Sequence, residues 1–351
     1  MRFDHDTLPQ RVRFASGAAA ENLAAEVAAL GARRVMVIAA TAEQELAHRI
    51  TDGLPVVHRH DDVVMHVPVE VAERARAEAA AHGTDVLVSI GGGSTTGLAK
   101  AVALTTGLPI VAVPTTYAGS EATPVWGLTE GSRKTTGTDP RALPRAVVYD
   151  ASLTLTLPAG LSAASGLNAL AHCVDSMWAP RTDPINQALA AEGVRALRTG
   201  LPLVVKEPDG LQSREQALYG AYLSAVAFAS AGSGLHHKIC HVLGGMFDLP
   251  HAQTHAVVLP HVLAFNGPQA PEAERRLAAA FDAPTANEGL ARLRAHLNAP
   301  RSLRELGMPE EGVAAAAEAV VAAAPAGNPR AVTLETISEL VQAAWEGTEP
   351  R

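Results

Sequence analysis

Short apolar runs alternate with Ala-rich stretches through the first 150 residues, and this alternation constrains the fold more than any other feature. Segments 33–40, 85–93, 109–116 and 145–150 are typical of buried β-strands. Their apolar residues are continuous rather than alternating, which is typical of a parallel sheet covered on both faces. Segments 21–31 and 69–83 have helical spacing, and each ends on Gly. Strand–helix alternation predicts a βαβ architecture.

The rhythm changes after residues 153–158, and from Ser162 onward the chain has helical spacing almost throughout. A chain of 351 residues accommodates two domains. We therefore predict an N-terminal α/β nucleotide-binding domain over residues 1–158 and an all-α C-terminal domain, carrying the substrate and catalytic residues, over 159–351.

Charge and cysteine content restrict the partners and the compartment. The formal net charge is −8 and Lys and Arg form no clusters, which argues against nucleic acid or an anionic membrane as a partner. Neither a signal peptide nor an apolar run of about 18 residues is evident. The two cysteines, Cys173 and Cys240, provide no disulfide framework, so we expect a cytoplasmic location.

Two loops rich in glycine and hydroxyl groups follow predicted strands. In the first, Gly91, Gly92, Gly93 and Ser94 precede a helical segment, where backbone N–H groups and the helix N-terminus favour a phosphate. The second carries Thr115 and Thr116. Either loop alone could be a simple turn or helix cap. Together they indicate a ligand site, because ligands bind at the carboxyl ends of parallel strands.

Histidines are concentrated in the helical half, with five between His236 and His255. Asn168 and His172 are four residues apart and share a helix face, as do His237 and His241, while His251 follows a proline-containing turn. Convergent imidazoles could bind zinc or iron, bind an anion, or transfer protons. We interpret His236, His255 and His261 as structural residues or as supports for the others.

These motifs together resemble the iron-containing alcohol dehydrogenase superfamily, with its dehydroquinate synthase-like fold, over nearly the whole chain. The resemblance implies that Gly91–Ser94 bind the pyrophosphate of a dinucleotide. It places Thr115, Thr116 and Lys134 near the ribose and nicotinamide. It also implies a metal site whose ligands are an Asp, a His four residues later and two further His. The residues at these positions are Asn168, His172, His237 and His251, and His241 corresponds to an additional histidine of the family.

The carboxylate of that metal site is replaced by Asn168, which leaves no anionic ligand for a divalent ion. The sequence thereby resembles the maleylacetate reductase branch, which is regarded as needing no metal. The resemblance implies NADH- or NADPH-dependent reduction of the C=C bond of maleylacetate, a dicarboxylate, to 3-oxoadipate in aromatic-compound degradation, by a homodimer. Residues 39–41 offer no carboxylate to repel a 2′-phosphate, so we expect both dinucleotides to be accepted.

On this hypothesis His172, His237, His241 and His251 form the substrate pocket with Asn168, and His241 or His251 donates the proton. Three alternatives remain open. A metal-dependent iron or zinc alcohol dehydrogenase could tolerate Asn168. Relatives of dehydroquinate synthase or glycerol-1-phosphate dehydrogenase keep a zinc-binding carboxylate that is missing here. A non-catalytic dinucleotide-binding protein would have no use for the clustered histidines.

Overall fold

The computed structural model describes residues 2–131 and 133–350, with all of their side chains except those of Arg133 and Lys134. The chain divides into two compact units, one formed by Leu8–Leu157 and the other by Met1–Thr7 together with Pro158–Arg351. No helix in the described part of the chain is long and apolar enough to cross a membrane.

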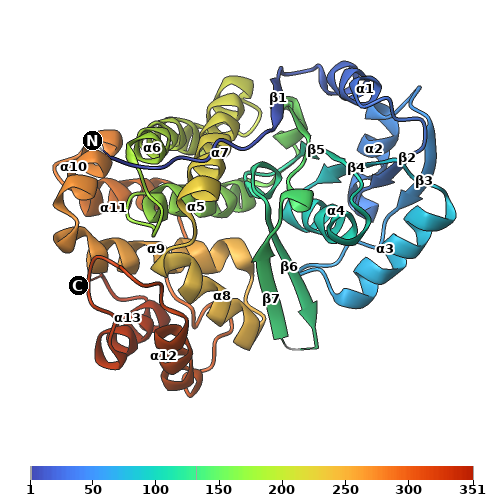
Figure 1. The fold of residues 1–351 in the computed structure, drawn as a ribbon. Helices are drawn as coiled ribbons and strands as arrows, with labels where there is room; N and C mark the ends of the chain where they lie inside the picture. Colours follow the sequence, from blue (N-terminus) through green and yellow to red (C-terminus); the bar gives the residue numbers. More distant parts are fainter. Residues whose placement is uncertain (1, 132, 351) are drawn as a thin grey trace. The chain divides into compact units, whose positions relative to one another are not determined.

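The first unit is built on a six-stranded parallel sheet of order β1-β8-β5-β4-β2-β3 (Figure 1). Its strands are β1 (Arg11–Phe14), β2 (Val35–Ile38), β3 (Val56–His60), β4 (Val86–Gly91), β5 (Ile110–Pro114) and β8 (Ala146–Tyr149). A separate antiparallel hairpin joins β6 (Val125–Glu130) to β7 (Arg133–Thr138). The four predicted strands are confirmed as β2, β4, β5 and β8, while β1, β3 and the hairpin were not predicted.

Helices cover both faces of this sheet, which confirms the expectation drawn from its continuous apolar strands. They are α1 (Ala19–Ala29), α2 (Gln44–Ile50), α3 (Val69–Ala81) and α4 (Gly93–Thr106). Val35 and Val37 of β2 pack with α1 and α2 in one core. Met36 and Ile38 of the same strand point to the opposite face and pack with α3 and α4 in a second core.

The second unit is helical, as predicted. Its helices are α5 (Ala159–Ser176), α6 (Pro184–Lys206), α7 (Leu211–Ala231), α8 (Leu235–Phe247), α9 (His251–Asn266), α10 (Pro271–Phe281), α11 (Ala286–His296), α12 (Gly312–Ala323) and α13 (Leu334–Glu346). Short 3-10 turns in the two units are η1 (Thr41–Glu43), η2 (Ser120–Ala122), η3 (Pro140–Ala142), η4 (Ala151–Thr154) and η5 (Gly267–Gln269). Helices α8, α9, α12 and α13 share one apolar core.

The unit boundary differs from the predicted domains at the N-terminus. Residues 1–7 group with the helical unit rather than with the α/β unit, to which the sequence analysis assigned them. One reason is that Nδ1 of His5 lies 2.8 Å from the carboxylate of Asp183, which caps the N-terminus of α6. The second boundary falls at Leu157/Pro158, one residue before the predicted one.

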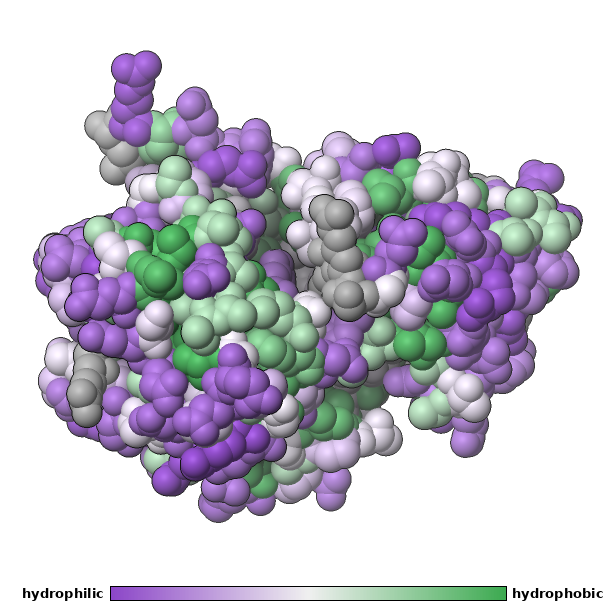
Figure 2. Space-filling model, turned by 90° about the horizontal axis from the view of Figure 1, so that it is seen from below, coloured by the Kyte–Doolittle hydropathy of each residue, from purple (hydrophilic) through white to green (hydrophobic). Residues whose placement is uncertain are grey.

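The chain has a formal net charge of −8 and 18% charged residues. Figure 2 shows hydrophilic side chains over most of the displayed face, interrupted by smaller apolar areas. The two cysteines are buried and unbridged, as their small number led us to expect.

Candidate active site

The glycine-rich loop lies where the strand order of the sheet reverses. The chain runs outward from β2 to β3 and then returns to place β4 on the other side of β2. Open α/β sheets bind ligands at the carboxyl ends of their strands at such a reversal. β4 ends at Gly91, and α4 begins at Gly93 after a single linking residue, Gly92. No side chain among the described residues caps α4, so its N-terminus suits an anion.

The two predicted loops are adjacent. Gly91 of β4 pairs with Pro114 of β5, and the backbone N–H of Thr115 donates to the carbonyl of Gly91 at 3.1 Å. Thr115 is buried and Thr116 is half-buried beside the glycines. The side chain of Lys134, assigned to the same site by resemblance, lies outside the described part of the structure.

Glycine is required in this loop for reasons of space and backbone conformation. Gly91 has a φ of 148°, and a Cβ there would lie 2.5 Å from Oγ1 of Thr95. A Cβ on Gly92 would lie 3.1 Å from Cγ2 of Thr116. Side chains at these two positions would therefore press against Thr95 and Thr116, whereas glycine lets the backbone N–H groups of the loop approach a diphosphate.

A buried lysine fixes α4 beneath this loop. Nζ of Lys100 donates to the hydroxyl of Thr123 at 3.1 Å and to the carbonyl of Val125 at 2.8 Å. Burial lowers the pKa of Lys100 to about 7, although the nearby carboxylate of Glu121 acts in the opposite direction. Lys100 thus connects α4, which follows the glycine-rich loop, to Thr123 and Val125, which follow the loop that carries Thr115 and Thr116. Lys100 was not among the residues predicted from the sequence.

The second predicted site is a buried histidine cluster in the helical unit. Asn168 and His172 lie one turn apart on α5, His237 and His241 on α8, and His251 begins α9. The rings of His172 and His237 stack with centroids 4.9 Å apart, and the ring of His241 lies 6.2 Å from that of His237. The structure therefore brings residues from three helices into one cluster.

His255 connects His251 to the rest of the cluster. Its ring centroid lies 4.4 Å from that of His251 and 5.0 Å from that of His237. A hydrogen bond also joins His255 to His236, with 2.9 Å between Nδ1 of His255 and Nε2 of His236. The interpretation of His236 and His255 as supporting residues agrees with these contacts, while His261 makes no ring contact with the cluster among the described pairs.

Asp175 organises the cluster, and the sequence analysis missed it. Its buried carboxylate accepts backbone N–H groups from Gly234 at 3.0 Å, His236 at 3.4 Å and His237 at 3.2 Å, at the beginning of α8. It also accepts Nδ1–H of His237 at 2.7 Å. A Cβ on Gly234 would overlap this carboxylate, so glycine is needed there. The signal was available, because Asp175 lies one turn beyond His172 on the same helix face.

When Asp175 is ionised it can only accept, so His237 then carries a proton on Nδ1. A neutral imidazole with its proton on Nδ1 has a lone pair on Nε2. That Nε2 atom is buried and has no hydrogen-bond partner among the described residues, and the same holds for Nδ1 of His172. Because buried polar atoms are normally hydrogen-bonded, these two nitrogens indicate a site for a polar ligand. The ring of Phe228 contacts both imidazoles and forms an apolar wall.

Burial lowers the pKa values of His172, His236, His237 and His255, which favours their neutral forms near neutral pH. It lowers the pKa of His172 to about 4 and that of His236 to about 3, where neighbouring imidazoles add to the effect. The pKa values of His237 and His255 are also well below their usual range, mainly through burial. Burial raises the pKa of Asp175 to about 7 against hydrogen bonds that favour its ionised form.

The residues at the family's metal positions fit a divalent ion poorly. Three neutral imidazoles and the amide of Asn168 supply no negative charge to compensate the ion. Among the described side chains of the helical unit, the group whose ligand atoms all lie within 4.8 Å of one another is His236, Cys240 and His255, not His172, His237 and His251.

Comparison with known proteins identifies the family. The model of "Iron-containing alcohol dehydrogenase" matches residues 9–151, and that of "Fe-containing alcohol dehydrogenase family, C-terminal" matches residues 162–345. The chain belongs to the iron-containing alcohol dehydrogenase family. This membership confirms the predicted fold class and makes the chain an oxidoreductase.

Its relatives cover the full length of the chain. Maleylacetate reductase of Sphingobium indicum is 46% identical over 353 residues, which span 100% of this chain and 99% of the relative. The crystal structure of an iron-containing alcohol dehydrogenase from Corynebacterium glutamicum is 60% identical, with a TM-score of 0.96 over 98% of this chain and 97% of that one. Maleylacetate reductase of a Rhizobium species is 44% identical, with a TM-score of 0.92 over 99% of both chains.

The substitution Gly91→Ala tests the dinucleotide loop. The new Cβ would meet Thr95 in a backbone conformation that strains non-glycine residues by about 1–3 kcal/mol, so we expect NADH to bind roughly ten- to a hundredfold more weakly. Fluorescence titration of NADH measures the change. Gly160→Ala is the matched control, because no atom lies within 4 Å of its added methyl group. Equal affinities in the two variants would contradict the assignment.

The substitution Asp175→Asn tests the role of the carboxylate. It removes the negative charge and turns one of the two accepting oxygens into an N–H₂ donor, which then opposes either a backbone N–H of α8 or Nδ1–H of His237. We therefore expect kcat to fall on the order of 10²–10⁴-fold, with a loss of about 1–3 kcal/mol in the free energy of unfolding. Asp183→Asn is the control, since Asp183 also caps a helix and bonds a histidine, but that histidine is His5, which does not belong to the cluster. Comparable kcat values in both variants would show that Asp175 is merely structural.

Proposed function

We propose that this enzyme reduces the C=C bond of maleylacetate to 3-oxoadipate with NADH or NADPH. The observation that carries the proposal is the buried cluster of neutral imidazoles with an amide, Asn168, at the carboxylate position of the family's metal site. The names of the full-length relatives support the same reaction.

The reaction balances as maleylacetate plus NAD(P)H plus one proton, giving 3-oxoadipate and NAD(P)⁺. The bound dinucleotide supplies the hydride, which adds to the alkene carbon β to the ketone. The electron pair of the C=C bond moves toward the ketone and forms an enolate, and the adjacent carbon then takes up a proton. Because the substrate's own ketone polarises the alkene, this step requires less Lewis acid assistance than alcohol oxidation does.

His172 and His237 are suited to hold the substrate. Their buried nitrogens lack partners among the described residues, and they face an apolar wall formed by Phe228. A bound carboxylate favours protonation of an imidazole. Asp175 would stabilise the resulting positive charge on His237 through the Nδ1–H hydrogen bond. Asn168 would add an amide N–H donor toward the substrate.

His241 and His251 are suited to deliver the proton. Both rings are half-buried, whereas His172 and His237 are buried. A proton donor must be recharged from solvent after each turnover, and partial exposure permits this exchange. General acid assistance of this kind contributes about 10²–10⁴-fold to rates.

The dinucleotide preference follows from the end of β2. Ala39, Ala40 and Thr41 follow this strand and carry no carboxylate that would repel a 2′-phosphate. We therefore propose that both NADH and NADPH serve as reductants. Comparing kcat/KM for the two determines the preference.

The deciding experiment measures NADH and NADPH oxidation with enzymatically generated maleylacetate, using protein stripped of metal by a chelator. We expect full activity without added metal and a large decrease in kcat for His172→Ala in the same assay. Activity that disappears with the chelator and returns with iron or zinc would contradict the metal-free mechanism. Absence of oxidation with any conjugated keto-diacid would contradict the proposed reaction itself.

A further inference from the structure

A second group of metal-binding side chains lies in the α/β unit, remote in sequence from the histidine cluster. His58 and His60 point to the same side of β3, because they are two residues apart on a strand. Glu78 lies on α3. One ligand atom from each of these side chains lies within 4.8 Å of the other two. β3 is the edge strand of the sheet, and α3 lies beside it (Figure 1).

The two imidazoles converge on one oxygen. Oε2 of Glu78 lies 2.8 Å from Nε2 of His58 and 2.6 Å from Nδ1 of His60. The Glu78 side chain is 38% exposed and that of His58 is 22% exposed, so an ion could reach the site from solvent. The side chain of His60 is only 3% exposed and forms the floor.

Both ring nitrogens of His60 face oxygen atoms. Nε2 of His60 lies 3.1 Å from the backbone carbonyl of Asp62, which can only accept a hydrogen bond. A neutral imidazole has one N–H, and if Nε2 carries it, the lone pair of Nδ1 faces the carboxylate of Glu78. One proton must therefore lie between Nδ1 of His60 and Oε2 of Glu78, and a metal ion can take the place of that proton if the two side chains move slightly apart.

The carboxylate is available in its ionised form. Burial acts to raise the pKa of Glu78, but the hydrogen bonds from His60 and His58 outweigh it and the pKa is lowered. An anionic oxygen with two imidazole nitrogens is a donor set that Zn²⁺ prefers, and solvent access leaves a position for water.

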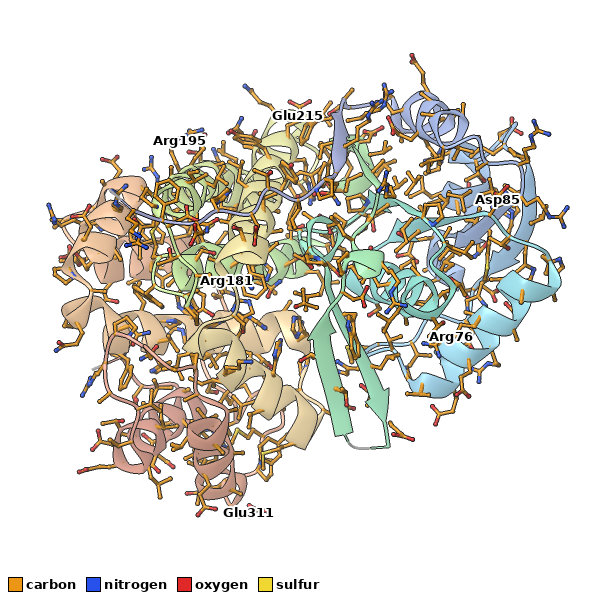
Figure 3. The ribbon with its side chains drawn as sticks, viewed as in Figure 1. Arg76, Asp85, Arg181, Arg195, Glu215 and Glu311 are labelled. Carbon is orange, nitrogen blue, oxygen red and sulfur yellow. The ribbon has the colours of Figure 1, made fainter. Side chains whose placement is uncertain are left out.

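The surroundings hold these side chains in place. The ring of His82 stacks on that of His58, with 4.4 Å between centroids. Nε of Arg34 donates to the carbonyls of His82 and Gly83 at 3.0 and 2.9 Å, which fixes the end of α3. Figure 3 shows Arg76 on α3, and its guanidinium donates to the carbonyl of Ala101 on α4 at 2.9 Å. The helix that carries Glu78 is therefore anchored at two points.

We propose that His58, His60 and Glu78 form a Zn²⁺ site that ties the edge strand β3 to α3. On binding, the Nδ1 proton of His60 would be released to solvent, and the proton of His58 would move from Nε2 to Nδ1. The ion would then replace the proton as the positive charge between the imidazoles and the carboxylate. This site belongs to the α/β unit and does not depend on the reaction proposed above.

The test measures Zn²⁺ binding by the full-length, untagged, metal-stripped protein, using equilibrium dialysis and thermal unfolding. We expect Glu78→Ala and His58→Ala to bind one zinc equivalent fewer than the wild type, or to bind it on the order of tenfold or more weakly. Zn²⁺ should raise the unfolding temperature of the wild type by more than that of either variant. Both altered side chains are partly exposed, so folding should be preserved.

Glu73→Ala is the matched control, because Glu73 is an exposed carboxylate on the same helix. Glu73→Ala should bind as much zinc as the wild type. His237→Ala, which alters the histidine cluster of the helical unit, should leave zinc binding by His58, His60 and Glu78 unchanged. Equal zinc binding by Glu78→Ala, His58→Ala and Glu73→Ala would overturn the proposal, as would the absence of zinc binding by the wild type.

Discussion

The Asp175 carboxylate fixes both the beginning of α8 and the orientation of the His237 ring. Three backbone N–H groups at the start of α8 and one imidazole N–H converge on it. Helix N-termini leave backbone N–H groups without partners inside the helix, so the Asp175 carboxylate stabilises the N-terminus of α8. The same carboxylate also bonds the ring of His237. The other rings of the cluster pack around His237, so their placement depends on this one buried group.

The same interaction indicates how a metal-site framework can operate with an amide in place of a carboxylate. Asn168 brings no charge to the cluster, and burial keeps the imidazoles neutral. On the proposed function, such a cluster binds an anion that brings its own charge, because protonation of the imidazoles then becomes favourable. A dicarboxylate fits this requirement, and Asp175 stabilises the imidazolium that would form.

Much of the fold was predictable because apolar patterning carries the signal. Apart from Ser89 in β4, the runs that became β2, β4, β5 and β8 are apolar, whereas β3 reads VVHRH and β1 reads RVRF. Both missed strands lie at the edges of the sheet, where one side of the strand stays accessible and polar residues are tolerated. The hairpin was missed because β6 has mixed polar and apolar residues that are mostly half-buried, and the described residues of β7 are mostly exposed and rich in Thr. Residues 1–7 group differently from the prediction, and long-range contacts such as that of His5 with Asp183 cannot be read from local sequence patterns.

The sequence predicted which residues form the candidate site better than it predicted the contacts between them. Helical spacing placed Asn168 with His172 and His237 with His241, and strand order placed the two cofactor loops together. Spacing alone could not show that His255 links His251 to His237, nor that Asp175 reaches across to α8, because those contacts depend on how the helices pack. The role of Lys100 was hidden for the same reason, since its partners lie more than twenty residues away in the chain.

The most direct test of this account is nitrogen-detected NMR of the histidine rings in ¹⁵N-histidine-labelled protein at neutral pH, with His237→Asn used for assignment. The account predicts that His237 is neutral in the free protein and carries its proton on Nδ1, and that a dicarboxylate substrate analogue converts it to the imidazolium. A His237 ring that is protonated on Nε2, or that is already cationic without ligand, would contradict the central role of Asp175.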